Sequence, residues 1–478
     1  MRNANGSGHE QRRQTDGPGK DEVNRMNDFR KTAQEMLEFI RISPTCFHAV
    51  ANIGRMLEAA GFQQLQEKEE WKLEKGGRYY TERNDSSVIA FAIPEKEVGI
   101  RGFHMAAAHS DSPCFKIKEK PELTVEEHYL RLNTEKYGGM ILSTWLDRPL
   151  SIAGRLAVKN GNGIEGRLVN IDRDLCVIPN VAIHMNREMN KGVEYNPQVD
   201  LLPLLADVSF DEYDTHTTYD AQTASENAEE QPETVEKPTL AALAAEAAGV
   251  DAETILGEDL FLYTRQEGKM IGAKGEFVLS PRLDDLQSAF ALTKAFTEST
   301  PAEYINLCAV FDNEEVGSGT RQGADSTFLE DTLQRITEGL QEGHSTYLRW
   351  VADSFLISAD NAHAVHPNHP EKADPANRPY LNGGIVIKYH GSQKYTTDGI
   401  SAAKMKDYCE RAKVPYQTYA NRSDIAGGST LGNISTAHVS VSSVDIGLPQ
   451  LAMHSAVETA GMKDTEYAVR VLREFWGE

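Results

Sequence analysis

The stretch that decides the fold is Phe311-Asp312-Asn313-Glu314-Glu315-Val316-Gly317-Ser318-Gly319-Thr320. It follows the apolar run Tyr304–Val310 (YINLCAV), which is predicted to be a buried β-strand. Glu314 and Glu315 therefore stand where a strand ends and a Gly-Ser-Gly loop begins. Ligands bind at the carboxyl ends of the strands in open α/β sheets. The pair is either an exposed acidic turn or two buried carboxylates, which repel each other unless a cation compensates their charge.

The composition is that of an ordinary globular protein, long enough for two or three domains. Of its 478 residues, 40% are hydrophobic and 25% are charged. The net charge of −23 argues against nucleic acid as a partner. The five cysteines are scattered without a CxxC pair, which favours reduced thiols in a cytoplasmic compartment over a disulfide framework. No apolar run approaches the roughly 18 residues of a membrane span, so no membrane partner is predicted.

Changes of character along the chain predict a catalytic domain in two parts with a second domain inserted between them. Residues 1–26 are polar, lack the apolar core of a signal peptide, and are predicted to be a disordered leader. Residues 27–112 and 271–478 have the long helical and strand patterns of an α/β domain. Between them, residues 113–270 carry short strands broken by turn signals, which predicts a β-rich domain. Its polar, acid-rich part near 211–237 is predicted to be a surface loop.

The spacing of apolar residues predicts the main helices and strands. The expected helices are 27–41, one opening at Ser43-Pro44 and ending near Gly61, 239–249 and 283–296. The expected strands are 88–94, 102–108, 355–359 and 439–446. Asn160-Gly161-Asn162-Gly163 lies between two short apolar segments and predicts a hairpin loop.

Polar, metal-ligating side chains follow several of these strands. His109 follows strand 102–108, Asp360 follows strand 355–359, and Asp284 opens a helix. His454 is predicted to lie at the start of the closing helix. Taken singly, these residues could equally have structural roles. A histidine after a strand is often structural, and an aspartate in the first turn of a helix complements the helix dipole.

Together, two histidines and three carboxylates, Glu315 among them, suit a pair of zinc ions, with one aspartate bridging. Adding Glu314 gives four negative charges, which match two divalent ions. Glu314 then needs no metal of its own and is free to act as a general base on the attacking water. Asp111 lies two residues beyond His109, an arrangement expected of a carboxylate that orients a metal-bound imidazole.

At this point the sequence resembles a known family, the aspartyl aminopeptidases and their relatives, including vacuolar aminopeptidase I. The resemblance spans about Phe29 to Glu478, without the segment near 211–237. It rests on the collinear stretches AAAHSDSPCFKIK (106–118), STWLDRPLSIAGR (143–155), VAIHMNREMN (181–190), SPRLDDLQSAF (280–290), FDNEEVGSGT (311–320), SADNAHAVHPNH (358–369) and LPQLAMHSAVE (448–458).

The resemblance implies a co-catalytic zinc site. One zinc would take His109, Asp284 and Asp360. The other would take Asp284, Glu315 and His454, with Mn or Co as substitute metals. Glu314 matches the general base of the family, and Asp111 matches its histidine-orienting aspartate.

The resemblance also implies an architecture and an assembly. The fold would be a phosphorylase/hydrolase-like zinc peptidase catalytic domain, of class α/β, interrupted by a β-rich dimerisation domain. Family members commonly assemble as tetrahedral dodecamers built from dimers. His184 matches a histidine that a subunit lends to the active site of its neighbour, although a structural histidine is the default for that position.

The residue preference stays open. Members strict for acidic residues carry Thr-Pro-Cys-Gly-Thr-Thr-Ile-Gly before the last strand, whereas Asp424–Gly432 here lacks the Pro-Cys pair. Lys388 matches a position near the substrate pocket of the family and would pair with an acidic side chain. A solvated strand lysine is the alternative.

The leading hypothesis is a dinuclear zinc aminopeptidase that releases unblocked N-terminal residues from peptides. One alternative is a metal-dependent dipeptidase or deacylase that reads a free C-terminus. Another is a catalytically silent, shell-forming scaffold, whose signature would be the loss of Glu314 or of a ligand. None of these residues is missing.

Overall fold

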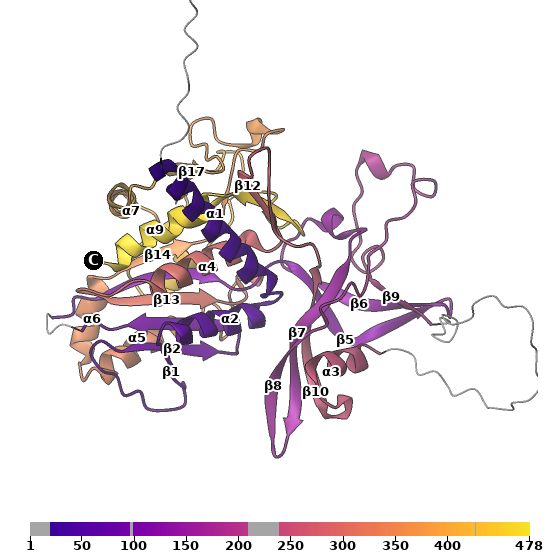
Figure 1. Cartoon of the computed structure of the whole chain (residues 1–478), viewed down its shortest axis with the longest axis horizontal. Helices are drawn as coiled ribbons and strands as arrows, with labels where there is room; N and C mark the ends of the chain where they lie inside the picture. The colour runs from indigo at the N-terminus through magenta and orange to yellow at the C-terminus, as the bar shows by residue number, and fades with distance from the viewer. Residues whose placement is uncertain (1–19, 96–98, 209–238, 426) are drawn as a thin grey trace, which may run out of the picture.

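The computed structural model describes residues 20–95, 99–208, 239–425 and 427–478. Its main feature is a nine-stranded mixed sheet in the order β1-β2-β3-β13-β4-β14-β18-β16-β17 (Figure 1). The strands are β1 (Gln63–Gln64), β2 (Arg78–Arg83), β3 (Ser87–Ala92), β4 (Phe103–His109), β13 (Ile305–Phe311), β14 (Phe355–Ala359), β16 (Ile385–Tyr389), β17 (Tyr416–Ala420) and β18 (Ser442–Gly447).

The four central strands β13, β4, β14 and β18 run parallel, so their carboxyl ends meet at one edge. Helices cover both faces of this sheet, and the apolar strands are buried on both sides as a result. One face carries α1 (Lys20–Arg41), α2 (Cys46–Ala59), α4 (Leu283–Thr297), α7 (Gly399–Ala412) and α9 (Asp464–Trp476). The other carries α5 (Phe328–Gly339), α6 (His344–Ala352) and α8 (Leu431–His438).

A second, six-stranded antiparallel sheet lies beside the first and is built from residues 114–264 (Figure 1). Its strands are β5 (Cys114–Val125), β6 (Tyr129–Tyr137), β7 (Leu150–Asn160), β8 (Gly163–Asn170), β9 (Leu204–Asp207) and β10 (Ile255–Thr264). Helix α3 (Leu240–Ala248) buries Leu240 and Ala244 against it. The predicted hairpin is confirmed, because Asn160 pairs with Gly163 across the turn. The predicted acidic loop 211–237 lies outside the described residues.

A small third sheet joins strands of residues 269–280 to strands of residues 362–363 and 449–461, and it was not predicted from the sequence. It contains β11 (Lys269–Ile271), β12 (Phe277–Ser280), β15 (Ala362–His363), β19 (Pro449–Leu451) and β20 (Glu458–Gly461). His454 lies in the turn between β19 and β20. The prediction that it opens the closing helix is therefore wrong, since α9 begins only at Asp464. The residues just after His454 form β20 instead, because they pair with the distant strand β12.

The helix boundaries differ modestly from the predicted ones. Helix α1 begins at Lys20, which removes residues 20–26 from the predicted leader, and residues 1–19 lie outside the described part. Helix α2 begins after Thr45, two residues later than Ser43 and Pro44 suggested. Gly61 follows its last turn with φ +85°, the left-handed conformation expected of a glycine that ends a helix. Among the described residues, no helix is long and apolar enough to cross a membrane.

Candidate metal centre

The five predicted metal ligands converge at the carboxyl edge of the parallel strands. The Nε2 atom of His109, at the end of β4, lies 3.6 Å from Oδ1 of Asp284 and 3.9 Å from Oδ1 of Asp360. The Nε2 atom of His454 lies 3.3 Å from Oδ2 of Asp284 and 3.4 Å from Oε2 of Glu315. Asp284 thus turns one carboxylate oxygen toward each histidine.

These side chains form two ligand groups that share Asp284. One is His109, Asp284 and Asp360, and the other is Asp284, Glu315 and His454; within each group the ligand atoms lie within 4.8 Å of one another. Oδ1 of Asp284 and Oε1 of Glu315 are buried and have no hydrogen-bond partner among the described residues. Buried carboxylate oxygens without donors are costly. The mixed nitrogen and oxygen donors therefore fit zinc well.

The electrostatics of the cluster agree with a cation site. Burial, followed by the charge of Asp284, raises the pKa of Glu315 well above its usual value. Burial also opposes ionisation of Asp284, yet the neighbouring rings of His109 and His454 hold its pKa low. Without a cation, His109 and His454 are the groups that compensate the charge of Asp284.

Asp111 holds both His109 and the two glutamates in place. The Nδ1 atom of His109 lies 3.0 Å from the Asp111 backbone oxygen and 3.4 Å from its Oδ1. The same carboxylate accepts the backbone N–H groups of Glu314 and Glu315, each at 3.2 Å. It also accepts the hydroxyl of Tyr137 at 2.7 Å. Asp111 was predicted only to orient His109, and its contacts with Glu314, Glu315 and Tyr137 were not predicted.

Glu314 lies beside the ligands in a short 3₁₀ turn, Glu314–Val316. The turn is bracketed by Asn313 and Gly317, both with positive φ, so the chain reverses immediately after β13. Carboxylate oxygens of Glu314 and Glu315 lie within 4.8 Å of a His109 ring nitrogen. Burial raises the pKa of Glu314 to about 7, and a general base works best when its pKa is near the operating pH.

Lys388 and His184 lie in very different surroundings. Lys388, on β16, is buried, and its Nζ donates to Oδ2 of Asp360 at 3.2 Å and to the backbone oxygen of Asn361 at 3.0 Å. The alternative of a solvated lysine is therefore wrong. His184 is exposed between β8 and β9, and the structure does not bring it to the metal ligands of its own chain. Its neighbours Ile183 and Met185 are exposed as well, Met185 by 82%.

Glu458 supports both ligand groups, and this role was not predicted from the sequence. Its carboxylate accepts the backbone N–H of Asp284 at 3.0 Å and that of His454 at 2.7 Å. Asp285 was missed too, and its carboxylate accepts the backbone N–H of His109 at 3.2 Å. Their only signal was position: Glu458 closes the stretch LPQLAMHSAVE, and Asp285 adjoins Asp284.

We expect Glu458→Gln to weaken metal binding by roughly 10–100-fold, the usual cost of losing a group that positions ligands. An amide keeps only one acceptor oxygen and turns an N–H toward one of the two backbone donors. The measurement is metal retained during dialysis against graded chelator. Glu338→Gln, at an exposed position on α5, is the matched control. Equal retention in Glu458→Gln and wild type would contradict this role.

An α/β sheet whose carboxyl edge carries two ligand groups with a shared aspartate and a neighbouring glutamate defines a metal-dependent hydrolase. The chain belongs to the aminopeptidase I zinc metalloprotease family (M18), whose model matches residues 39–476. It is a zinc metallo-aminopeptidase, and the predicted family and fold class are confirmed.

Its relatives match over nearly their whole length. A probable M18 family aminopeptidase 2 from Clostridium novyi is 46% identical, covering 93% of this chain and 98% of the relative. That of Pseudomonas putida is 40% identical, covering 92% and 97%. Among solved structures, a chain of the Ape4 and Nbr1 complex is 36% identical with a TM-score of 0.87, covering 95% of this chain and 86% of that one. The S. cerevisiae mApe1 dodecamer gives 26% and 0.77, covering 94% and 97%.

Proposed function

We propose that this aminopeptidase is dinuclear and removes unblocked N-terminal residues from peptides. The sharing of Asp284 between the two ligand groups carries the proposal. His109 and Asp360 would complete one zinc site, and Glu315 and His454 the other. Mn²⁺ or Co²⁺ would be accepted in place of zinc, because both bind the same kinds of ligand. Bound zinc supplies Lewis-acid polarisation of the scissile carbonyl and lowers the pKa of the attacking water.

The residues of the chain itself handle the protons. Glu314 accepts a proton from the attacking water and passes it to the leaving amine. Asp111 fixes the turn that carries Glu314 through the backbone N–H groups of residues 314 and 315. The position of the general base, Glu314, is therefore fixed by hydrogen bonds before water attacks.

We expect the purified protein to carry two zinc ions per chain, and chelation to abolish its activity. The reason is that each ligand group supplies one histidine and one carboxylate in addition to the shared Asp284. Elemental analysis together with a chelator titration measures both quantities. One ion or none in a fully active preparation would contradict a dinuclear site.

A pair of blocked peptides separates this function from that of a dipeptidase or deacylase. An aminopeptidase cleaves a peptide amide with a free amino group and leaves an amino-acetylated peptide with a free carboxylate intact. The opposite pattern would indicate that a free C-terminus is read.

We further propose a preference for N-terminal Asp or Glu. Lys388 has three N–H donors, of which Asp360 and the Asn361 carbonyl use two. The third remains for the carboxylate of a substrate side chain. This buried ammonium lies next to a proposed metal ligand, where the first residue of a substrate would be held.

We expect Lys388→Met to lower kcat/KM for Asp and Glu substrates roughly 10–100-fold more than for Leu substrates, the cost of a lost charge-assisted hydrogen bond. The comparison between substrates removes any general effect on metal binding through Asp360. Lys269→Met, at an exposed position on β11, is the control. An unchanged ratio would show that Lys388 serves Asp360 alone.

We also propose that the chain assembles as a tetrahedral homododecamer of dimers in the cytoplasm, with the inserted β-rich domain as the dimer contact. Exposed Ile183, Met185 and Val199 in that domain support a protein partner. A solved structure similar to this chain is that of a dodecamer. All five cysteines lie in the described part and are unpaired, which supports a reducing compartment.

A further inference from the structure

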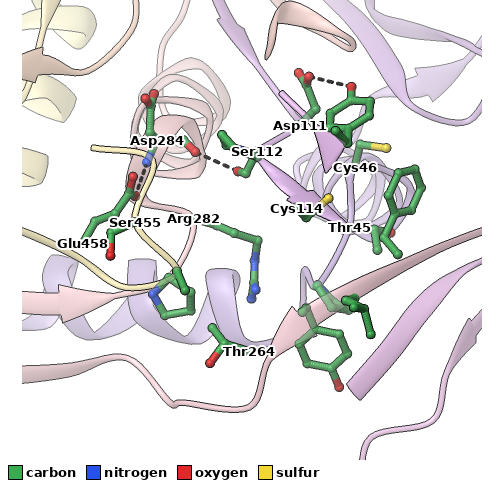
Figure 2. A pocket seen from close by; sticks show the side chains of 18 of the residues that line it. Thr45, Cys46, Asp111, Ser112, Cys114, Thr264, Arg282, Asp284, Ser455 and Glu458 are labelled. Atoms are coloured by element: carbon green, nitrogen blue, oxygen red, sulfur yellow. Dashed lines mark hydrogen bonds between the residues drawn. The ribbon is translucent and has the colours of Figure 1, made fainter. Parts of the chain in front are cut away.

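A small cavity lies behind the metal centre, between α2 and the inserted sheet (Figure 2). Its walls include Thr45 and Cys46 at the start of α2, Cys114, Thr264 at the end of β10, and Arg282. The volume of the cavity that is accessible to water-sized molecules is about 40 Å³. Figure 2 shows the Arg282 side chain extending into the midst of these residues, whereas the carboxylates of Asp284 and Asp111 point away.

The guanidinium of Arg282 makes no salt bridge with a carboxylate of the described residues. Its Nη2 donates to the backbone oxygen of Ile40 at 3.0 Å, and the ring of Tyr263 lies 5.8 Å away. Its Nε is buried without a hydrogen-bond partner, and no described carboxylate forms an ion pair with it. A guanidinium carries five N–H donors, so most of them still need an acceptor. A buried cation left in this state is costly.

The backbone at Arg282 also points to a role for its side chain. Its φ is +53°, in the left-handed region that glycine adopts readily and a side chain adopts only at a cost. This conformation precedes the first turn of α4. A glycine would meet this backbone requirement at lower cost, but it would leave the cavity without the guanidinium that Figure 2 shows there.

Further features beside Arg282 favour an anion in the cavity. Thr45, the residue before α2, makes no capping hydrogen bond, and its hydroxyl instead lies 2.9 Å from Nδ1 of His48. The positive end of α2 therefore faces the cavity without a side-chain acceptor. Burial, followed by the charges of Arg282 and Arg55, lowers the pKa of His48 to about 4. The Thr264 hydroxyl accepts the Gln266 N–H at 3.3 Å and keeps its own proton to donate.

The carboxylates at the rim are already engaged. Asp111 accepts three hydrogen bonds from Tyr137, Glu314 and Glu315. Glu458 accepts the backbone N–H groups of Asp284 and His454. Neither carboxylate forms a hydrogen bond with the guanidinium, although the charge of Glu458 acts on Arg282 at longer range.

We propose that this cavity binds one small monovalent anion, held by Arg282, the Thr264 hydroxyl and the amino end of α2. The space suits a halide or bicarbonate, because it would hold roughly three water molecules and is too small for a peptide side chain or a phosphate ester. Arg282 stands two residues before Asp284. The anion therefore secures the segment that carries the shared ligand against both α2 and the inserted sheet, whatever the substrate of the enzyme.

The test uses the full-length, zinc-loaded protein at constant ionic strength. Thermal unfolding is followed with chloride or bicarbonate replacing gluconate, an anion too large for the cavity. We expect one of the small anions to raise Tm by roughly 1–3 °C in wild type and not in Arg282→Met. Arg349→Met, at an exposed position on α6 away from the cavity, is the matched control and should respond as wild type does.

A gain with chloride identifies a halide site, and a gain with bicarbonate alone identifies a site for carboxylate-type anions. A chloride response should be accompanied by a bromide anomalous peak at Arg282 in soaked crystals. Should Arg282→Met fail to fold, Thr264→Val removes one donor and should weaken the response. No gain with either anion, an equal gain in the cavity variants and wild type, or a bromide peak only elsewhere would overturn the proposal.

Discussion

Glu314→Gln should lower turnover by roughly 10²–10⁴-fold, the usual contribution of a general base, while both zinc ions remain bound. The glutamine keeps the shape of the side chain and loses only the ability to take a proton. Asp111 would still hold the turn, because its two contacts here are with the backbone N–H groups of residues 314 and 315. The measurements are kcat and metal content of the same preparation.

Glu315→Gln should fail for a different reason. Its carboxylate lies 3.4 Å from Nε2 of His454, within one ligand group, and an amide oxygen would coordinate without balancing the charge of zinc. We expect one zinc to be bound more weakly and added zinc to restore activity in part. Added zinc should hardly affect Glu314→Gln. If Glu314→Gln is the variant rescued, the two roles are reversed.

Much of this site could be predicted from the sequence because its ligands come at the ends of buried strands. The apolar runs that predicted strands at 304–310, 102–108 and 355–359 correspond to β13, β4 and β14. Strands buried on both faces show as continuous apolar segments. Parallel neighbours then place the residues that follow each strand, such as His109 and Asp360, at one edge.

The rest depends on contacts between distant residues. Tyr137 of β6 donates to Asp111 and accepts from Asn313, which lies 176 positions away in the sequence. The backbone oxygen of Gly139 lies 2.7 Å from Nδ1 of His454, 315 positions away. No local pattern marks a backbone acceptor or a tyrosine that will meet a particular aspartate, so periodicity could not reveal these partners.

These contacts tie the inserted sheet to the metal centre. The backbone oxygen of Gly139, just after β6, holds the Nδ1 atom of His454, which leaves Nε2 to face Asp284 and Glu315. Gly138 lies against Glu315, and a Cβ built there would be 3.1 Å from the Glu315 Cβ, so this backbone approaches closely. Any contact that moves the inserted domain, such as a subunit interface, is therefore coupled to the geometry of the ligands.

His184→Ala should fold, bind zinc and lose most of its activity. His184 is exposed and belongs to no ligand group of its own chain, and it lies beside Ile183 and Met185, exposed apolar residues of the kind that subunit contacts bury. We expect it to act on substrate in the active site of the neighbouring subunit. Activity, metal content and assembly size are measured together, with His366→Ala, at another exposed position, as control. Unchanged turnover would show that His184 is only a surface residue.

A mixing experiment distinguishes a shared active site from a local defect. The His184→Ala chain keeps its own Glu314, and the Glu314→Gln chain keeps the histidine that its partner lacks. If the two are dissociated and reassembled in equal amounts, half of the dimers are mixed and each holds one intact site. About a quarter of wild-type activity should then return, because a twofold contact exchanges the same residues in both directions. Two inactive variants that stay inactive together, although they co-assemble, would place both residues in one subunit's site.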